Sequence, residues 1–273
     1  MSDAARSLPV AEVGWRGHAE KVGRAAIGGW TTVRELYSLF VRTLYYCVKG
    51  RREKGDILVQ MYEIGNRSMV FLSITMGFIG MILFYQSGTQ LKKVLPETAM
   101  MGATYIELMV RDLGASLGAM MLATRVGAGI AAELGSMVVT EQVDALRMTA
   151  ADPVDFLIVP RFVASLIMSV VILILGTVVA ILTGFVTGFV FFQIRPDVFF
   201  NLQLVDKGDL ILGLTKMVTY GAAIPIVSAH AGFSAHGGSE GVGWATTRAV
   251  VNSSLAILML NAVISAAGFL LFP

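Results

Sequence analysis

Long stretches without a charged residue dominate the hydrophobic pattern of this chain. A membrane-spanning helix needs about 20 apolar residues, and four runs without Asp, Glu, Lys or Arg are long enough. These runs cover residues 68–91, 162–194, 217–239 and 249–273. The run at 162–194 would extend roughly 50 Å as a helix, so we expect it to tilt or to project beyond the bilayer. The pattern predicts a polytopic, all-α integral membrane protein.

A fifth span is predicted at residues 99–124, although this segment carries charge. Glu107, Arg111 and Asp112 fall inside it, and ionisable groups at membrane depth usually face a bundle interior, a cavity or one another. Glu107 and Arg111 are four residues apart, so we expect them to pair on one helix face. Two interpretations are open: the three residues pair near the outer membrane interface, or they line a substrate pathway.

The N-terminal segment, residues 1–66, has the pattern of an amphipathic helix followed by a linker. Its apolar side chains recur every three or four positions: Val22, Ala26, Trp30, Val33, Tyr37, Phe40 and Leu44. Basic residues occupy the other face, which predicts a helix lying in the membrane interface. A water-soluble helix packed on a partner is the alternative. A polar break at 50–55 and a short linker helix through Tyr62 are then expected to lead into the five-span domain, residues 67–273.

A short polar segment separates the second and third predicted spans. Glu141, Asp144 and Arg147 recur at three-residue spacing. The apolar side of the same segment consists of Val139, Val143 and Leu146. This spacing predicts an amphipathic helix over about 136–148, which either only re-enters the membrane or docks a partner from the water side. Asp152 suits an N-cap and Pro153 the first helical position, so the third span is expected to begin there.

Basic residues are concentrated before the first span, where they fix the predicted orientation. They are Arg6, Arg16, Lys21, Arg24, Arg34, Arg42, Lys49, Arg51, Arg52, Lys54 and Arg67. Because segments rich in Lys and Arg stay in the cytoplasm, the N-terminus is expected to be cytoplasmic and, after five spans, the C-terminus periplasmic. Lys92 and Lys93 fall on the outer face in this arrangement but are outnumbered.

Few residues in the chain are suited to chemistry. It has one cysteine, Cys47, and its three histidines lack metal-ligand spacing, so neither an internal disulfide nor a metal site is predicted. No phosphate-binding Gly-x-x-x-x-Gly-Lys-Ser/Thr motif occurs. We therefore predict no catalytic residues and no enzyme. If ATP drives this protein, the ATPase is a separate chain.

Small residues follow two of the predicted spans at four-residue spacing. They are Gly114 and Gly118 on the second span, and Gly176, Ala180, Gly184 and Gly188 on the third. Such stripes let helices approach closely, either within one chain or between two copies. Pro225 is expected to kink the fourth span because it lacks an N–H and crowds the preceding turn.

Three sequence blocks resemble the MlaE/YrbE permease family of ABC transporters associated with MCE proteins. The first is RVGAGIAAELG at 125–135, which leads into VTEQVDAL at 139–146. The second is Asp152-Pro153 followed by VPR at 159–161, and the third is GGSEGVGWATTRAVV at 237–251. Their order and spacing match the family over about residues 50–272.

The resemblance implies a homodimeric permease in the bacterial inner membrane that moves lipid, with phospholipid expected. It also implies a separate ABC ATPase on the cytoplasmic side, an MCE-domain protein on the outer face and no nucleic-acid partner. ATP and Mg²⁺ would then bind the ATPase, with no cofactor in this chain. The ATPase-coupling residues implied are Glu133, Thr140, Glu141, Gln142, Asp144 and Arg147. Arg111 and Asp112 match a basic–acidic pair that the family places near its cavity, so with Glu107 they are assigned to the substrate pathway or the MCE contact.

Two other functions are open at this point. A non-transporting membrane scaffold for an MCE complex would have the same spans, and lipid-stimulated ATPase activity would distinguish a permease from it. A secondary transporter would be expected to contain internal repeats and ion-coupling groups near the membrane midplane. No repeat is evident, and the later apolar runs are uncharged.

Overall fold

The computed structural model describes residues 13–49, 54–94 and 100–271. Every regular element within these residues is helical. Among them, five helical stretches are long and apolar enough to cross a membrane: Gly55–Lys93, Met101–Val139, Val154–Phe192, Lys207–Phe233 and Ser239–Leu271. The fold class is therefore confirmed as an all-α membrane protein with five candidate spans.

The second and third spans each contain π-helical turns. The α-helices are α1 (Val13–Lys49), α2 (Lys54–Val94), α3 (Met101–Leu108), α4 (Gly114–Leu122), α5 (Ala128–Val139), α6 (Gln142–Met148), α7 (Val159–Phe192), α8 (Pro196–Phe199), α9 (Lys207–Phe233) and α10 (Ser239–Leu271). The π segments Met109–Leu113 and Ala123–Gly127 join α3, α4 and α5, and Val154–Ile158 precedes α7. The second span is therefore one continuous helix that extends well beyond the predicted 99–124.

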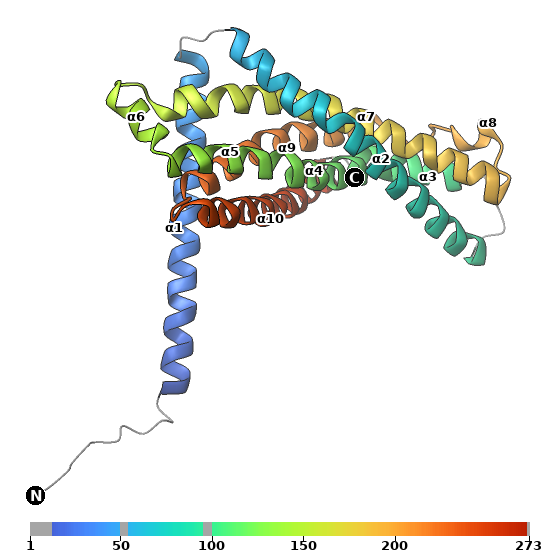
Figure 1. Ribbon diagram of the computed structural model, residues 1–273. Helices are drawn as coiled ribbons and strands as arrows, with labels where there is room; N and C mark the ends of the chain where they lie inside the picture. Colours follow the sequence, from blue (N-terminus) through green and yellow to red (C-terminus); the bar gives the residue numbers. More distant parts are fainter. Residues whose placement is uncertain (1–12, 50–53, 95–99, 272–273) are drawn as a thin grey trace, which may run out of the picture.

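Helix α1 crosses one end of the bundle, and α2, α7 and α10 begin at this end (Figure 1). We call it the α1 end, and the opposite end the α8 end. Apolar side chains such as Trp30, Val33 and Tyr37 are exposed on α1, as a helix lying in a membrane interface requires. The helix extends at both ends beyond the predicted apolar pattern, which runs from Val22 to Leu44. Residues 1–12 and 50–53 of the N-terminal segment, which include Arg6, Arg51 and Arg52, lie outside the described residues.

The first span has no separate linker helix, and the prediction of one through Tyr62 was wrong. Helix α2 runs without interruption from Lys54 to Val94. No proline interrupts this helix. Glu63 and Arg67, four residues apart, form an ion pair of 2.6 Å, which stabilises the turn where the polar part of the helix meets its apolar run.

The small-residue stripes serve contacts within the chain. A Cβ added to Gly80 of α2 would collide with the backbone of Ala180 on α7. Tyr105 closes the same crossing, because its hydroxyl lies 3.2 Å from the Gly80 carbonyl oxygen and 2.9 Å from that of Ala180. On the second span, a Cβ at Gly114 would meet the side chain of Thr177 on α7. Of the two uses predicted for these stripes, the structure therefore shows the intramolecular one.

Pro225 lies inside α9, and a neighbouring helix compensates for the hydrogen bond that it removes. Proline has no N–H to donate to the carbonyl four residues earlier, which is that of Gly221. The Ser165 hydroxyl on α7 donates to this carbonyl instead, at 3.1 Å. Side chains of neighbouring helices commonly satisfy carbonyls freed in this way inside membranes.

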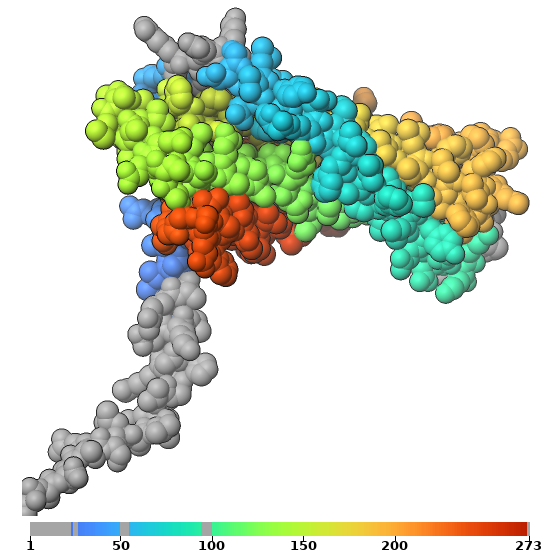
Figure 2. Space-filling view, in the orientation of Figure 1, coloured from blue at the N-terminus to red at the C-terminus, as the bar shows by residue number. Residues whose placement is uncertain are grey.

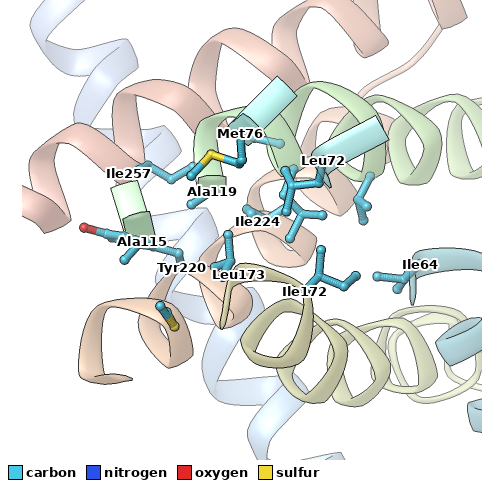
Figure 3. Close-up of a cluster of buried hydrophobic side chains, with 14 of the residues drawn as sticks. Ile64, Leu72, Met76, Ala115, Ala119, Ile172, Leu173, Tyr220, Ile224 and Ile257 are labelled. Carbon is cyan, nitrogen blue, oxygen red and sulfur yellow. The ribbon is translucent and has the colours of Figure 1, made fainter. Parts of the chain in front are cut away.

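The core of the bundle gathers apolar side chains from several spans, as Figure 3 shows. Leu72 and Met76 of α2, Leu173 of α7, Tyr220 of α9 and Ile257 of α10 are all buried there. This packing places the second span in the middle of the bundle, in contact with its neighbours.

Candidate functional site

The polar turn between α5 and α6 is exposed at the α1 end. The side chains of Thr140, Glu141, Gln142, Asp144 and Arg147 are all accessible to water. On the other side of the turn, the predicted apolar residues face the protein: Val143 is buried, and Val139 and Leu146 are partly buried. An ion pair of 3.0 Å between Asp144 and Arg147 keeps both groups on the water side of α6.

The predicted single helix over 136–148 is in fact two helices with a break at Thr140 and Glu141. Glu141 adopts a left-handed conformation with φ of 60°, which ends α5 in the manner of a helix C-cap. The Thr140 hydroxyl donates to the Ser136 carbonyl at 2.8 Å, which closes the last turn of α5. The polar segment is thus a turn at Thr140 and Glu141 followed by the seven-residue helix α6.

Glu133 lies nearly two turns before this break and ties α5 to the third span. Its carboxylate is 2.6 Å from the guanidinium of Arg161, whose side chain is buried. A further nitrogen of Arg161 donates to the Leu157 carbonyl at 2.6 Å. This charged hydrogen bond connects α5 to the beginning of α7.

Asp152 fixes both the beginning of the third span and the position of α1. One carboxylate oxygen accepts the Val154 N–H at 2.9 Å, as the predicted N-cap would. The other accepts from the Tyr46 hydroxyl at 2.7 Å and from Arg42 at 2.9 Å. Partial burial alone would raise the pKa of Asp152, but these hydrogen bonds and the Arg42 charge outweigh it and lower the pKa below its usual 3.8. Helix α1 is thereby anchored to the loop that follows α6.

A second charged cluster lies inside the bundle, around the π segment Met109–Leu113. Arg111 is 3.2 Å from Asp209, and Asp112 is 2.6 Å from Lys216. Lys216, only 1% exposed, also donates to the Ser265 hydroxyl of α10 at 2.8 Å. The π turn allows the two adjacent residues Arg111 and Asp112 to reach α9 together, and π turns occur frequently at functional sites.

The pairing expected between Glu107 and Arg111 was wrong. Arg111 instead pairs with Asp209, because the π segment turns its side chain towards α9. Glu107 is half-buried and forms no ion pair within the part of the chain that the structure describes. The sequence did not identify Asp209 and Lys216 as site residues. Both precede the uncharged run 217–239, although α9 begins at Lys207 and carries them into the bundle.

Comparison with known proteins identifies the family. The permease MlaE family model matches residues 57–267. A probable ABC transporter permease of Rickettsia typhi is 36% identical over 211 residues, which cover 77% of this chain and 81% of the relative. The chain belongs to the MlaE permease family.

Two further relatives support the same assignment. A probable ABC transporter permease of Synechocystis is 36% identical over 222 residues, covering 81% of this chain and 84% of the relative. The intermembrane phospholipid transport system permease protein MlaE of Haemophilus influenzae is 32% identical over 222 residues, covering 80% and 85%. The protein is thus an ABC transporter permease of the MlaE family, and the family match includes both charged regions described above.

Proposed function

We propose that this MlaE-family permease is the membrane subunit of an ATP-driven phospholipid transporter of the bacterial inner membrane. The observation that carries the proposal is the family match over residues 57–267, supported by the phospholipid transport named for the Haemophilus relative. In this proposal two copies form the membrane unit, a separate ATPase binds ATP and Mg²⁺, and an MCE-domain protein lies on the outer face.

The α5–α6 turn is the proposed docking site of the ATPase. Its polar side chains are exposed at the α1 end, while the apolar side of α6 lies against the protein. Basic residues near this end, such as Arg42, Arg67 and Arg147, favour its cytoplasmic placement. A push on the turn would move α5 directly, and also α7 through the ion pair between Glu133 and Arg161.

We propose that this movement reaches the charged cluster around Arg111 and Asp112. It belongs to the same continuous helix as α5, and its π segment is a place at which the helix can change register. About a third of each of these two side chains is exposed, so they can also meet a lipid headgroup or the MCE partner. Burial of each acyl CH₂ in a cavity would stabilise bound lipid by about 0.8 kcal/mol.

Affinity purification of the tagged protein in mild detergent tests this proposal. Mass spectrometry of the purified complex should recover an ABC ATPase, an MCE-domain protein and bound phospholipid. Recovery of the folded permease with none of the three would contradict the transporter assignment. Recovery of both proteins with no lipid, and no stimulation of the ATPase by added phospholipid, would favour a scaffold.

A further inference from the structure

A polar pocket of about 460 Å³ lies at the α1 end between α2 and the second span. Figure 2 shows this face of the molecule, with α2 in blue and the second span in green. The polar residues that line the pocket are Gln60, Glu63, Arg67, Ser68, Arg125 and Glu133. The volume is within the range of small-molecule binding sites.

The pocket lies at the depth of lipid headgroups. On α2, the charged residues end at Arg67 and the uncharged run 68–91 begins with Ser68, both of which line the pocket. On the second span, Arg125 is the first charged residue after an uncharged stretch that begins at residue 113. Because the boundary between charged and apolar residues marks the membrane surface, both walls place the pocket there.

The charges around the pocket match a ligand that carries both signs. Arg125 forms no ion pair within the described residues, and its Nε donates to the Arg67 carbonyl at 3.0 Å, which leaves the two terminal nitrogens free. Glu63 and Glu133 each use one carboxylate oxygen, for Arg67 and Arg161 respectively. Among the described residues their second oxygens accept no hydrogen bond, so one free cation and two open carboxylate oxygens surround the pocket.

Two further features suit the pocket to a ligand. The Ser68 hydroxyl is buried at its wall and has no hydrogen-bond partner among the described residues, which is unusual for a buried polar group. Gly129 also lines the pocket, and a Cβ added there would meet nothing within 4 Å. The space in front of Gly129 is therefore open, and a side chain at this position would extend into the pocket.

We propose that this pocket binds the headgroup of a zwitterionic aminophospholipid such as phosphatidylethanolamine. The phosphate would accept from the terminal nitrogens of Arg125, and the ammonium group would donate to the open oxygens of Glu63 and Glu133. A purely anionic headgroup would leave these carboxylates facing a like charge, so the pocket should favour the zwitterion. The inference rests on the proposed function only in taking lipid as the ligand, and it adds a headgroup preference at the α1 end.

Lipid titration of the delipidated permease, followed by native mass spectrometry, tests the proposal without ATP or an ATPase. Phosphatidylethanolamine should bind about three- to tenfold more tightly than phosphatidylglycerol of the same acyl chains. Glu63→Gln should bring this ratio close to one while phosphatidylglycerol still binds. Arg125→Gln should weaken both lipids, and Gly129→Leu should abolish the preference by filling the pocket.

Gly29→Leu on α1 is the matched control, because a Cβ there also meets open space but the residue does not line the pocket. It should bind both lipids as the wild type does. Equal affinity of the wild type for the two lipids, or an unchanged ratio in both Glu63→Gln and Gly129→Leu, would overturn the proposal. Competition by soluble phosphoethanolamine as strong as that by the lipid would also overturn it, because the ligand would then not be a lipid. Transport is measured in a separate experiment, so failure of the headgroup proposal is distinguishable from failure of the proposed transport function.

Discussion

Lys216 is the least exposed charged side chain in the described part of the chain, and Asp112 compensates its charge. Replacing it with methionine removes the cation and leaves Asp112 without a partner inside the bundle. Because Asp112 is about a third exposed, we expect Lys216→Met to lower the free energy of unfolding by about 2 kcal/mol, less than for a fully buried pair. Thermal unfolding in detergent measures this change.

The double variant Asp112→Asn with Lys216→Met should recover part of this loss, since neither group is then an uncompensated charge. The control is Arg147→Ala, which breaks the pair with Asp144. Both of those side chains are 66% exposed, and we expect a change within about 0.5 kcal/mol. A Lys216→Met variant no less stable than Arg147→Ala would show that the buried pair does not stabilise the bundle.

Asp152 should make the anchoring of α1 dependent on pH. Its pKa is lower in the folded protein than the usual 3.8, so its contribution to stability is complete above that value and is lost as the pH falls through the folded pKa. The difference in melting temperature between the wild type and Asp152→Asn should therefore be constant above about pH 5 and shrink below about pH 4. A melting-temperature difference that is the same at pH 3 and at pH 6 would show that the Asp152 charge does not anchor α1.

The crossing of α2 and α7 should tolerate a methyl group at one glycine and not at another. At Gly80 the added Cβ would collide with the Ala180 backbone, which cannot move as a side chain does. We expect Gly80→Ala to lower the free energy of unfolding by about 1–3 kcal/mol. Gly77→Ala, on the same helix, places its Cβ 3.4 Å from the Thr183 methyl group and should be neutral or stabilising. Equal melting temperatures of the two variants would contradict this description of the helix crossing.

The turn between α5 and α6 allows coupling to be separated from folding. Glu141→Gly removes the exposed carboxylate and relieves a left-handed backbone conformation, so it should stabilise the fold by up to about 1 kcal/mol. Lipid-stimulated ATPase activity of the assembled complex should nevertheless fall several-fold. Gln193→Gly, at a residue with φ of 54° that ends α7 at the α8 end, is the matched control and should keep full activity. Full activity in Glu141→Gly would show that this carboxylate has no role in coupling.

The hydrophobic pattern predicted the five spans, and four of them were unambiguous because they are uncharged runs such as 162–194. It did not predict their ends. Lys54–Val94 continues as one helix because a local ion pair bridges its polar part. Helix α5 ends at Val139 because Glu141, a residue other than glycine, adopts a left-handed conformation just after it. Neither feature has a reliable sequence signal.

The charged cluster was predicted only on the second span. Arg111 and Asp112 were visible as charges within an apolar segment, but their partners lie about a hundred residues further along the chain. Only the packing of α9 against the π segment Met109–Leu113 brings Asp209 and Lys216 to them. The absence of proline between Lys207 and Lys216 was the signal available for including both residues in the span.

The whole molecule joins an exposed turn at the α1 end to a buried charged cluster through one continuous helix, Met101–Val139. The ion pair of Glu133 with Arg161 connects this helix to α7, and that of Asp152 with Arg42 connects the loop after α6 to α1. In the proposed mechanism, a force applied at the turn would change the position of several spans together.

ATP-dependent transfer of labelled phospholipid tests the central claim most directly. It is measured in proteoliposomes that contain the permease with the proposed ATPase and MCE-domain partner. We predict transfer in the presence of ATP and Mg²⁺, none with a non-hydrolysable ATP analogue, and a strong reduction in an Arg111→Ala variant that still assembles. A fully assembled complex that hydrolyses ATP but transfers no phospholipid would contradict the claim that this chain is a lipid permease.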